Sequence, residues 1–199
     1  MEIRSVYLVC PGKVQLKGDK RRYIGQCDVP LSEEGLKQVQ ELCRVLKKVN
    51  FSAAYCSDLS RSQQTAEIII TDKKIAIISR RDLREIDYGK WQGRTFREIA
   101  RSFPEKFRAR GADIGYYRIP GGESFADCSK RVVAAFYDIL EHSEGHVLIV
   151  GDAGINRALI CHILGIPVAN VSRIEQDDGC LNIIECKNSV VKIKLLNYI

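Results

Sequence analysis

Two short runs of apolar residues constrain the fold of this chain most strongly. Residues 6–9 read Val-Tyr-Leu-Val and residues 147–150 read Val-Leu-Ile-Val, with no alternation of polar and apolar positions. Short uninterrupted runs that contain β-branched residues are typical of central strands in a parallel sheet, which are covered on both faces. The chain is therefore expected to contain a buried, parallel sheet.

Three segments carry signals of helices that would cover this sheet. Ser32 and Ser124 are suitable N-caps, and apolar residues recur every three or four positions after each of them. The third segment, 156–164, is closed by Gly165, which is followed by Pro167. The apolar positions expected to face the core are Leu36, Val39, Leu42, Leu46 and Val49 in the first helix, and Phe125, Cys128, Val132, Phe136 and Ile139 in the second.

Strands that alternate with helices predict the α/β class, in three layers: a mostly parallel sheet with helices on both faces. The composition agrees with this prediction, because 199 residues that are 45% hydrophobic and 28% charged suit one domain, which we place at 1–199. Ligands of such folds bind at the carboxyl ends of the strands. The residues that follow the two apolar runs, 10–13 and 151–154, are therefore expected to lie at the ligand site.

The chain has no apolar leader segment and no apolar stretch near the roughly 18 residues that a membrane helix needs, so we expect a cytoplasmic protein without membrane contact. Its eight cysteines are scattered without any Cys-x-x-Cys spacing. Reduced thiols are the favoured interpretation, and we expect neither a metal nor a cofactor.

Several segments beyond the first strand form one recognisable pattern. They are 25–35 (Gly-Gln-Cys-Asp-Val-Pro-Leu-Ser-Glu-Glu-Gly), 57–67 (Ser-Asp-Leu-Ser-Arg-Ser-Gln-Gln-Thr-Ala-Glu), 83–93 (Leu-Arg-Glu-Ile-Asp-Tyr-Gly-Lys-Trp-Gln-Gly), 121–124 (Gly-Gly-Glu-Ser) and 151–154 (Gly-Asp-Ala-Gly). Together with residues 6–13 they resemble the histidine phosphatase superfamily, the phosphoglycerate mutase-like proteins. The segment 175–182 looks most like small bacterial α-ribazole-phosphate phosphatases.

The resemblance implies a phosphoglycerate mutase-like fold and a site that transfers phosphoryl groups through a histidine. The family's Arg-His-Gly-Glu/Gln segment matches Cys10, Pro11, Gly12 and Lys13 here, so that Pro11 stands where the nucleophilic histidine belongs. The second active-site histidine matches Asp152. Both catalytic histidine positions are thus replaced.

Other site residues match the family pattern. The resemblance implies that Arg61 binds phosphate, that Glu85 occupies the position of the proton donor, and that Gly25 belongs to the ligand site together with Cys10, Gly12 and Lys13. Arg61 is the one residue retained from the family's two arginines and two histidines.

The replacements remove the chemistry of phosphoryl transfer. Proline has no lone pair to attack phosphorus, and a thiol at position 10 is a weak donor compared with the planar fork of an arginine. An ionised Asp152 about 4 Å from a phosphate oxygen costs roughly 1 kcal/mol per unit charge pair in water and about 4 at an effective dielectric constant of 20. The sequence therefore favours a catalytically degenerate phosphatase-like protein, in which Asp152 pairs with Arg61 or with Lys13.

The net charge of +6 is unevenly distributed. Basic residues cluster after the first strand, at Lys13, Lys17, Lys20, Arg21 and Arg22, and on one expected helix, at Arg94, Arg97, Arg101, Lys106, Arg108 and Arg110. Such clusters favour an anionic small molecule or an acidic protein surface as the partner, with a solvated basic loop as the alternative. Nucleic acid is disfavoured, because no recognised binding motif or interleaved aromatic residues accompany the charges.

Two other functions stay open at this point. One is an active phosphatase or mutase that uses Asp152 or Cys10 as a non-standard nucleophile. The other is a basic nucleic-acid-binding or regulatory module, whose binding would depend steeply on salt. The sequence specifies neither the ligand nor the oligomeric state.

Overall fold

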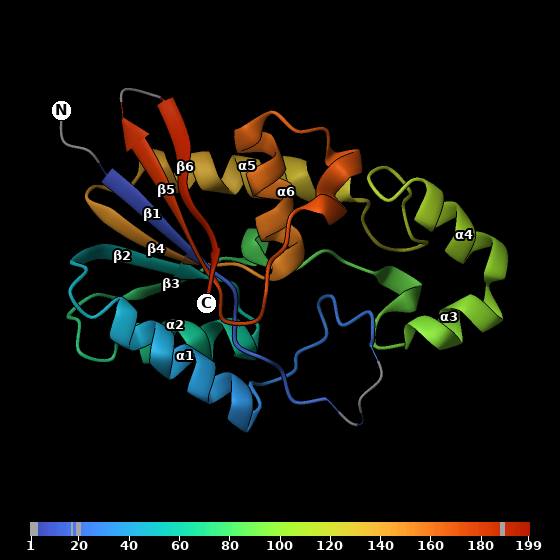
Figure 1. Ribbon diagram of the computed structural model, residues 1–199, viewed down its shortest axis with the longest axis horizontal. Helices are drawn as coiled ribbons and strands as arrows, with labels where there is room; N and C mark the ends of the chain where they lie inside the picture. The colour runs from blue at the N-terminus through green and yellow to red at the C-terminus, as the bar shows by residue number, and fades with distance from the viewer. Residues whose placement is uncertain (1–3, 17, 19–20, 188–189) are drawn as a thin grey trace.

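A computed structural model describes residues 4–16, 18, 21–187 and 190–199 (Figure 1). Within this part of the chain, six strands form one sheet in the order β3-β2-β4-β1-β5-β6. The strands are β1 (Arg4–Val9), β2 (Phe51–Cys56), β3 (Ile77–Ser79), β4 (His146–Val150), β5 (Leu181–Lys187) and β6 (Val190–Tyr198). The first four are parallel, whereas β5 runs antiparallel to β1 and β6 antiparallel to β5. The predicted mostly parallel sheet is confirmed.

The two apolar runs are neighbours at the centre of this sheet. Val6 pairs with Val147 and Val9 pairs with Val150 in a parallel ladder. The side chains of 147–150 are all buried, as are those of Val6, Leu8 and Val9. Because both runs point in the same direction, the residues that follow them emerge together at one edge of the sheet.

Helices cover both faces, as predicted (Figure 1). One face carries α1 (Glu33–Val45) and α2 (Ser60–Ile70), and the other carries α5 (Phe125–Glu141) and α6 (Ala153–Leu164). Each pair encloses a separate apolar core against the sheet. The remaining helical segments among the described residues are α3 (Phe96–Ser102), α4 (Pro104–Ala112) and three short 3₁₀ turns at Arg81–Leu83, Gly89–Trp91 and Val168–Arg173.

The predicted N-caps form. The Ser32 hydroxyl accepts a 3.1 Å hydrogen bond from Gly35 N, and Ser124 forms a capping box with Asp127 at the start of α5. Two details of the first helix were wrong: α1 already ends at Val45, and Leu36 is 37% exposed because it lies on the outer side of the first turn. The helix expected from residue 156 begins three residues earlier, at Ala153.

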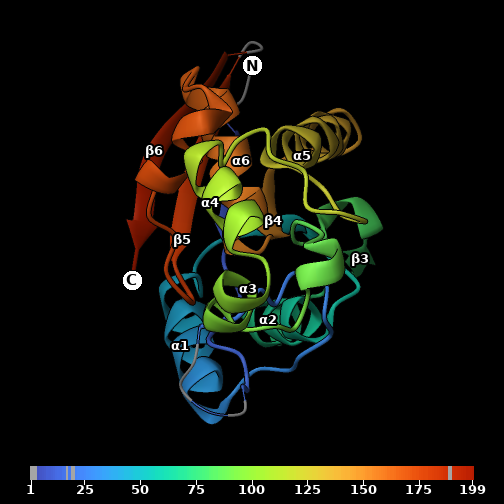
Figure 2. The same cartoon turned by 90° about the vertical axis from the view of Figure 1, so that its right-hand side faces the viewer.

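The basic segment from Arg94 to Arg110, which was expected to form one helix, contains two helices. Pro104 cannot continue the hydrogen bonding of α3, so the chain turns at Phe103 and starts α4. Both helices extend from the end of the sheet where the parallel strands finish (Figures 1 and 2). We call residues 89–118 the cap. It rests on its own small apolar cluster, which includes Tyr23, Trp91 and Ile99.

None of the helices in the described part of the chain combines the length and the apolar character that a membrane span requires.

Candidate functional site

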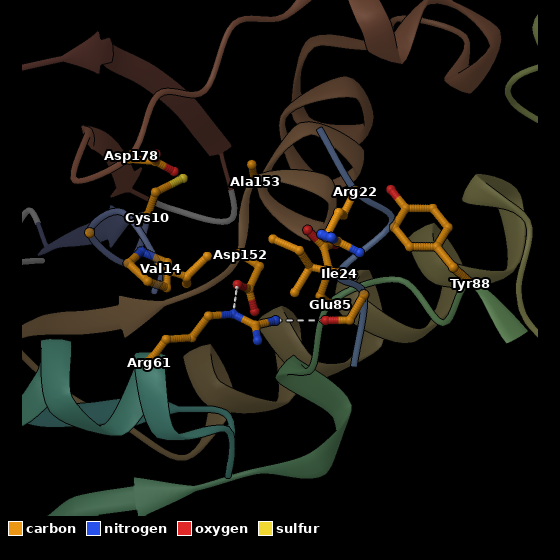
Figure 3. Close-up of a pocket in the computed structure, with 13 residues that line it drawn as sticks. Cys10, Val14, Arg22, Ile24, Arg61, Glu85, Tyr88, Asp152, Ala153 and Asp178 are labelled. Atoms are coloured by element: carbon orange, nitrogen blue, oxygen red, sulfur yellow. Dashed lines mark hydrogen bonds and ion pairs between the residues drawn. The ribbon is translucent and has the colours of Figure 1, made fainter. Parts of the chain in front are cut away.

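A pocket of about 170 Å³ opens at the carboxyl ends of β1 and β4 (Figure 3). The sequence predicted a site at this edge, and most of the residues it named contribute to the wall. These are Cys10, Pro11, Gly12, Gly25, Arg61, Glu85 and Asp152. The structure thus brings together side chains that lie up to 142 positions apart in the sequence.

The first part of the wall follows β1. Cys10 and Pro11 are buried, and the carbonyl group of Pro11 accepts a hydrogen bond from Gly179 N at 2.9 Å. Gly12 crosses the start of α1 at very close range, since a Cβ atom at this position would lie 2.3 Å from the carbonyl oxygen of Gly35. Only glycine fits there, which fixes the path of the backbone out of β1.

Arg61 lies in the first turn of α2 and is 2% exposed. Its Nε donates to Oδ1 of Asp152, its NH1 group donates to the carbonyl group of Cys27 at 2.9 Å, and its NH2 group donates to that of Gly25 at 2.7 Å. Burial opposes the charge on Arg61, but Asp152 and the other nearby carboxylates raise the pKa of the guanidinium group. All three nitrogen atoms therefore have protein partners, and the expected Arg61–Asp152 ion pair is present.

Asp152 is the N-cap residue of α6, where a negative charge interacts favourably with the helix dipole. Its side chain is 9% exposed and does not cap the helix by a hydrogen bond. One oxygen, Oδ1, accepts from Arg61, whereas the buried Oδ2 has no hydrogen-bond partner in the described structure. Asp152 thus neutralises the charge of Arg61, and its second oxygen, Oδ2, is a buried acceptor without a hydrogen bond in the described structure.

Glu85 approaches the same ion pair from the loop that precedes the cap. In Figure 3 the guanidinium group of Arg61 lies between the carboxylates of Asp152 and Glu85. The Glu85 carboxylate accepts hydrogen bonds from Ile86 N at 2.7 Å and Gly154 N at 2.9 Å. Burial, followed by the negative charge of Asp152, raises the pKa of Glu85 to about 7. Near neutral pH, a substantial fraction of Glu85 is therefore protonated.

Cys10 is held in a buried polar network instead of facing the pocket with a charge. Asn156 Nδ2 donates to its sulfur at 3.2 Å, and the thiol contacts Oε1 of Gln176 at 3.7 Å. Gln176 is held in turn by two 2.8 Å hydrogen bonds with Asn182. A hydrogen bond to Cys180, followed by burial, raises the pKa of Cys10 well above its ordinary value. The thiolate that a cysteine nucleophile requires is thereby disfavoured.

Lys13, which was expected at the ligand site, lines a neighbouring pocket. Its side chain is exposed and forms an ion pair with Glu34 at 2.6 Å. Lys17 and Lys20 of the same basic loop lie outside the described residues. Arg22 lines the main pocket, and Arg21 lines the neighbouring one.

Sequence reasoning missed Asp178 and Tyr88, which complete the pocket wall. Asp178 is hard to assign because it precedes β5 instead of following a parallel strand. Since β5 is antiparallel to β1, the start of β5 lies at the same edge as the end of β1. The sequence signal for Asp178 was the pair Asp177-Asp178 before Gly179, just ahead of the apolar segment that forms β5.

In the part of the chain that the structure describes, no group of three or more His, Cys, Asp or Glu side chains could hold a metal ion.

The comparisons with known proteins agree with this geometry. The model of the Histidine phosphatase superfamily (branch 1) matches residues 6–199. The chain is 27% identical over 193 residues to the adenosylcobalamin/alpha-ribazole phosphatase of Escherichia coli (strain K12), covering 96% of this chain and 95% of that protein. It is 33% identical over 189 residues to the probable phosphoglycerate mutase GpmB of Enterobacter sp. (strain 638), covering 93% and 86%. The solved structure of Bacillus stearothermophilus YhfR superimposes with a TM-score of 0.91 at 27% identity, covering 98% of each chain. The chain belongs to the histidine phosphatase superfamily.

Proposed function

We propose that this protein is a catalytically degenerate histidine phosphatase, which binds a ligand or partner in the cytoplasm without transferring phosphoryl groups. Its family pattern puts Pro11 and Asp152 at the two catalytic histidine positions. Neither replacement supplies a neutral imidazole, which in this family forms the phosphoenzyme. All eight cysteines are free thiols, which suits the reducing conditions of the cytoplasm.

The proposal rests on one observation: Asp152 forms an ion pair with Arg61, the residue expected to bind phosphate. A phosphate-binding arginine presents its fork to the incoming oxygens, but here Asp152, Gly25 and Cys27 take all three nitrogen atoms of the side chain. An entering phosphate would have to displace a buried ion pair and would also meet the charge of Asp152. Both effects oppose binding of a phosphoryl group in the pocket.

An activity assay on the purified chain tests the proposal. We expect no hydrolysis of p-nitrophenyl phosphate above a mock purification from cells that lack the gene. Turnover that disappears in Pro11→Ala or in Asp152→Asn would contradict the proposal. Turnover that both variants retain unchanged would identify a contaminating phosphatase.

Phosphate binding provides a second, independent test. Titration calorimetry with inorganic phosphate should show no binding to the wild type, whereas Asp152→Asn should gain measurable affinity because it removes the charge that repels phosphate and that neutralises Arg61. Lys48→Gln is the control, since Lys48 is exposed beyond the end of α1 and does not line the pocket. Tight binding to the wild type that Asp152→Asn leaves unchanged would contradict the closed site.

One observation favours the alternative of a working phosphatase. Glu85, with its pKa near 7, has the protonation behaviour of a general acid at neutral pH. Such an enzyme would need Asp152 or Cys10 as its nucleophile. Hydroxylamine trapping distinguishes this case, because it cleaves the acyl phosphate that an Asp152 nucleophile would form, and a phosphorylated Cys10 would be detected by mass spectrometry.

The cap supports an acidic protein surface as the partner. Residues 89–118 contain eight lysines and arginines against three acids, and Arg97, Arg101, Lys106 and Arg108 are all exposed. A surface of this kind attracts carboxylate-rich segments by long-range electrostatics. We therefore place the docking face for such a partner on α3 and α4, away from the closed pocket.

Poly-glutamate is a suitable probe of this face. Binding should weaken at least tenfold in the double variant Arg101→Glu/Arg108→Glu, while the matched variant Lys47→Glu/Lys48→Glu, located beyond the end of α1, should bind like the wild type. Equal loss in both variants would refute a specific face. Tighter binding of a single-stranded oligonucleotide than of poly-glutamate, with a steep salt dependence, would favour the nucleic-acid alternative.

A further inference from the structure

Cys10 and Cys180 face one another where β1 and β5 end. The two strands are antiparallel, with Val9 opposite Leu181, so that Cys10 and Cys180 are the next opposed pair. Cys10 N donates a 2.9 Å hydrogen bond to the carbonyl group of Cys180. Opposed residues of antiparallel strands have Cα atoms about 4.5–5.5 Å apart, within the range of about 4.4–6.8 Å that a disulfide requires.

The two thiols also interact with each other. This interaction raises the pKa of Cys10 and lowers that of Cys180. The pair therefore releases one proton more readily than an isolated buried cysteine. Elsewhere in the core, burial raises the pKa of Cys56, Cys128 and Cys161.

Small molecules reach this pair from the pocket. Cys10 forms part of the wall of the 170 Å³ cavity, whereas Cys180 lies directly behind it and is fully buried. The cavity has room for a peroxide molecule, which is comparable in size to water. Cys10 is thus accessible from the pocket, and Cys180 is adjacent to it as a partner for a disulfide.

We propose that Cys10 and Cys180 are a redox site at which hydrogen peroxide forms a reversible disulfide. This assignment does not depend on the loss of phosphatase activity. Cys180, the sulfur with the lowered pKa, releases its proton to solvent and then takes up the proton of Cys10 as the Cys10 sulfur attacks one peroxide oxygen. The O–O bond breaks, Cys10 becomes a sulfenic acid, and the departing hydroxide takes up a proton from solvent and leaves as water.

The second step closes the disulfide. The sulfur of Cys180 attacks the sulfur of Cys10, the S–O bond breaks, and hydroxide leaves with the remaining thiol proton as a second water molecule. Overall, two thiols lose two electrons and one peroxide becomes two waters. The disulfide withdraws the Cys10 sulfur from Asn156 and Gln176, so oxidation also changes the hydrogen bonding behind the pocket.

Peptide mapping of the folded protein tests this proposal. The wild type is treated with hydrogen peroxide, its remaining thiols are blocked with N-ethylmaleimide after denaturation, and the digest is analysed by mass spectrometry. We expect a peptide pair that joins Cys10 to Cys180, that has lost two hydrogen atoms, and that dithiothreitol separates again. Recovery of both cysteines as free thiols, or a link from Cys10 to another cysteine, would overturn the assignment.

Two variants sharpen the experiment. Cys180→Ser should abolish the cross-link and carry the oxidation of Cys10 on to sulfinic acid, whereas Cys161→Ser, which changes an equally buried cysteine in α6, should leave the cross-link at the wild-type level. If Cys180→Ser does not fold, the peptide map of the wild type still tests whether Cys10 and Cys180 are joined. A cross-link that appears only when peroxide is added after unfolding would also refute a site built by the native geometry.

Discussion

The main-chain N–H of Gly154 donates a 2.9 Å hydrogen bond to Oε2 of Glu85, which ties the first turn of α6 to the loop before the cap. Gly154 approaches so closely that a Cβ atom there would lie 2.2 Å from Oε1 of Glu85. Glu85 is consequently held beside Asp152 in surroundings that raise its pKa to about 7. This shift makes the stability of the protein depend on pH.

The first prediction is that Glu85 destabilises the native state progressively as pH rises from about 4.5 to about 7. In that interval the native protein holds a proton on Glu85 that the unfolded chain, with an ordinary glutamate pKa of 4.5, has released. The free energy of unfolding therefore falls with pH, by up to about 3 kcal/mol for a shift of this size. Urea unfolding at pH 5 and pH 8 should show that the wild type loses this amount relative to Glu85→Gln.

Glu105→Gln is the control for that measurement, because Glu105 is exposed on α4 and should keep the pH dependence of the wild type. A stability difference between the wild type and Glu85→Gln that is constant from pH 5 to pH 8 would contradict the prediction.

The second prediction concerns the buried ion pair. Asp152→Ala removes the carboxylate that pairs with Arg61 Nε, and Arg61→Met leaves the buried carboxylate of Asp152 without its cation, so each should cost up to about 3–5 kcal/mol, with Glu85 beside Arg61 reducing the cost of the first. The double variant should cost clearly less than the sum, because neither partner is left without the other. Unfolding free energies of the four proteins form a double-mutant cycle. Additive effects would show that the two side chains do not stabilise one another.

The third prediction compares two glycines. Gly12→Ala should destabilise the protein by about 1–3 kcal/mol, since its Cβ atom would lie 2.3 Å from the carbonyl oxygen of Gly35 and the backbone has to shift. Gly111→Ala should instead stabilise it by up to about 1 kcal/mol, because Gly111 lies in α4 with no atom within 4 Å of an added Cβ. Thermal unfolding of both variants measures the contrast. Equal effects would mean that the close crossing after β1 does not constrain the fold.

The fourth prediction, which rests on the proposed function, is that phosphoryl-transfer chemistry can be built into the pocket. Cys10→Arg, Pro11→His and Asp152→His together should restore phosphate binding and slow hydrolysis of p-nitrophenyl phosphate, because Arg61 and Glu85 still occupy the pocket wall. Lys13 needs no change, since it lies outside this pocket and pairs with Glu34. Any two of the three substitutions should achieve far less, as catalytic groups that act as a unit are strongly non-additive. A folded triple variant that neither binds phosphate nor becomes phosphorylated would contradict the prediction.

The features predictable from sequence are those that depend on local patterns. The runs at 6–9 and 147–150 indicated the central strands, and Ser32 and Ser124 marked two helix starts, because burial and capping leave periodic signals in the chain. The pairing of Arg61 with Asp152 followed from charge and the shared strand edge. The ion pair of Lys13 with Glu34 was not predicted, because it depends on the direction of the backbone after Gly12. Asp178, Gln176 and Cys180 were missed as partners of the site because only the antiparallel pairing of β5 brings them to it.

The ion pair between Arg61 and Asp152 also restricts how this protein can evolve. Because Asp152 is the countercharge of a buried arginine, Arg61 has a structural task that is independent of phosphate. On the proposed function, a change of Asp152 to histidine alone would remove this countercharge while position 11 still lacks a nucleophile. The ion pair would then act as an evolutionary ratchet, because this step lowers stability without any gain in activity.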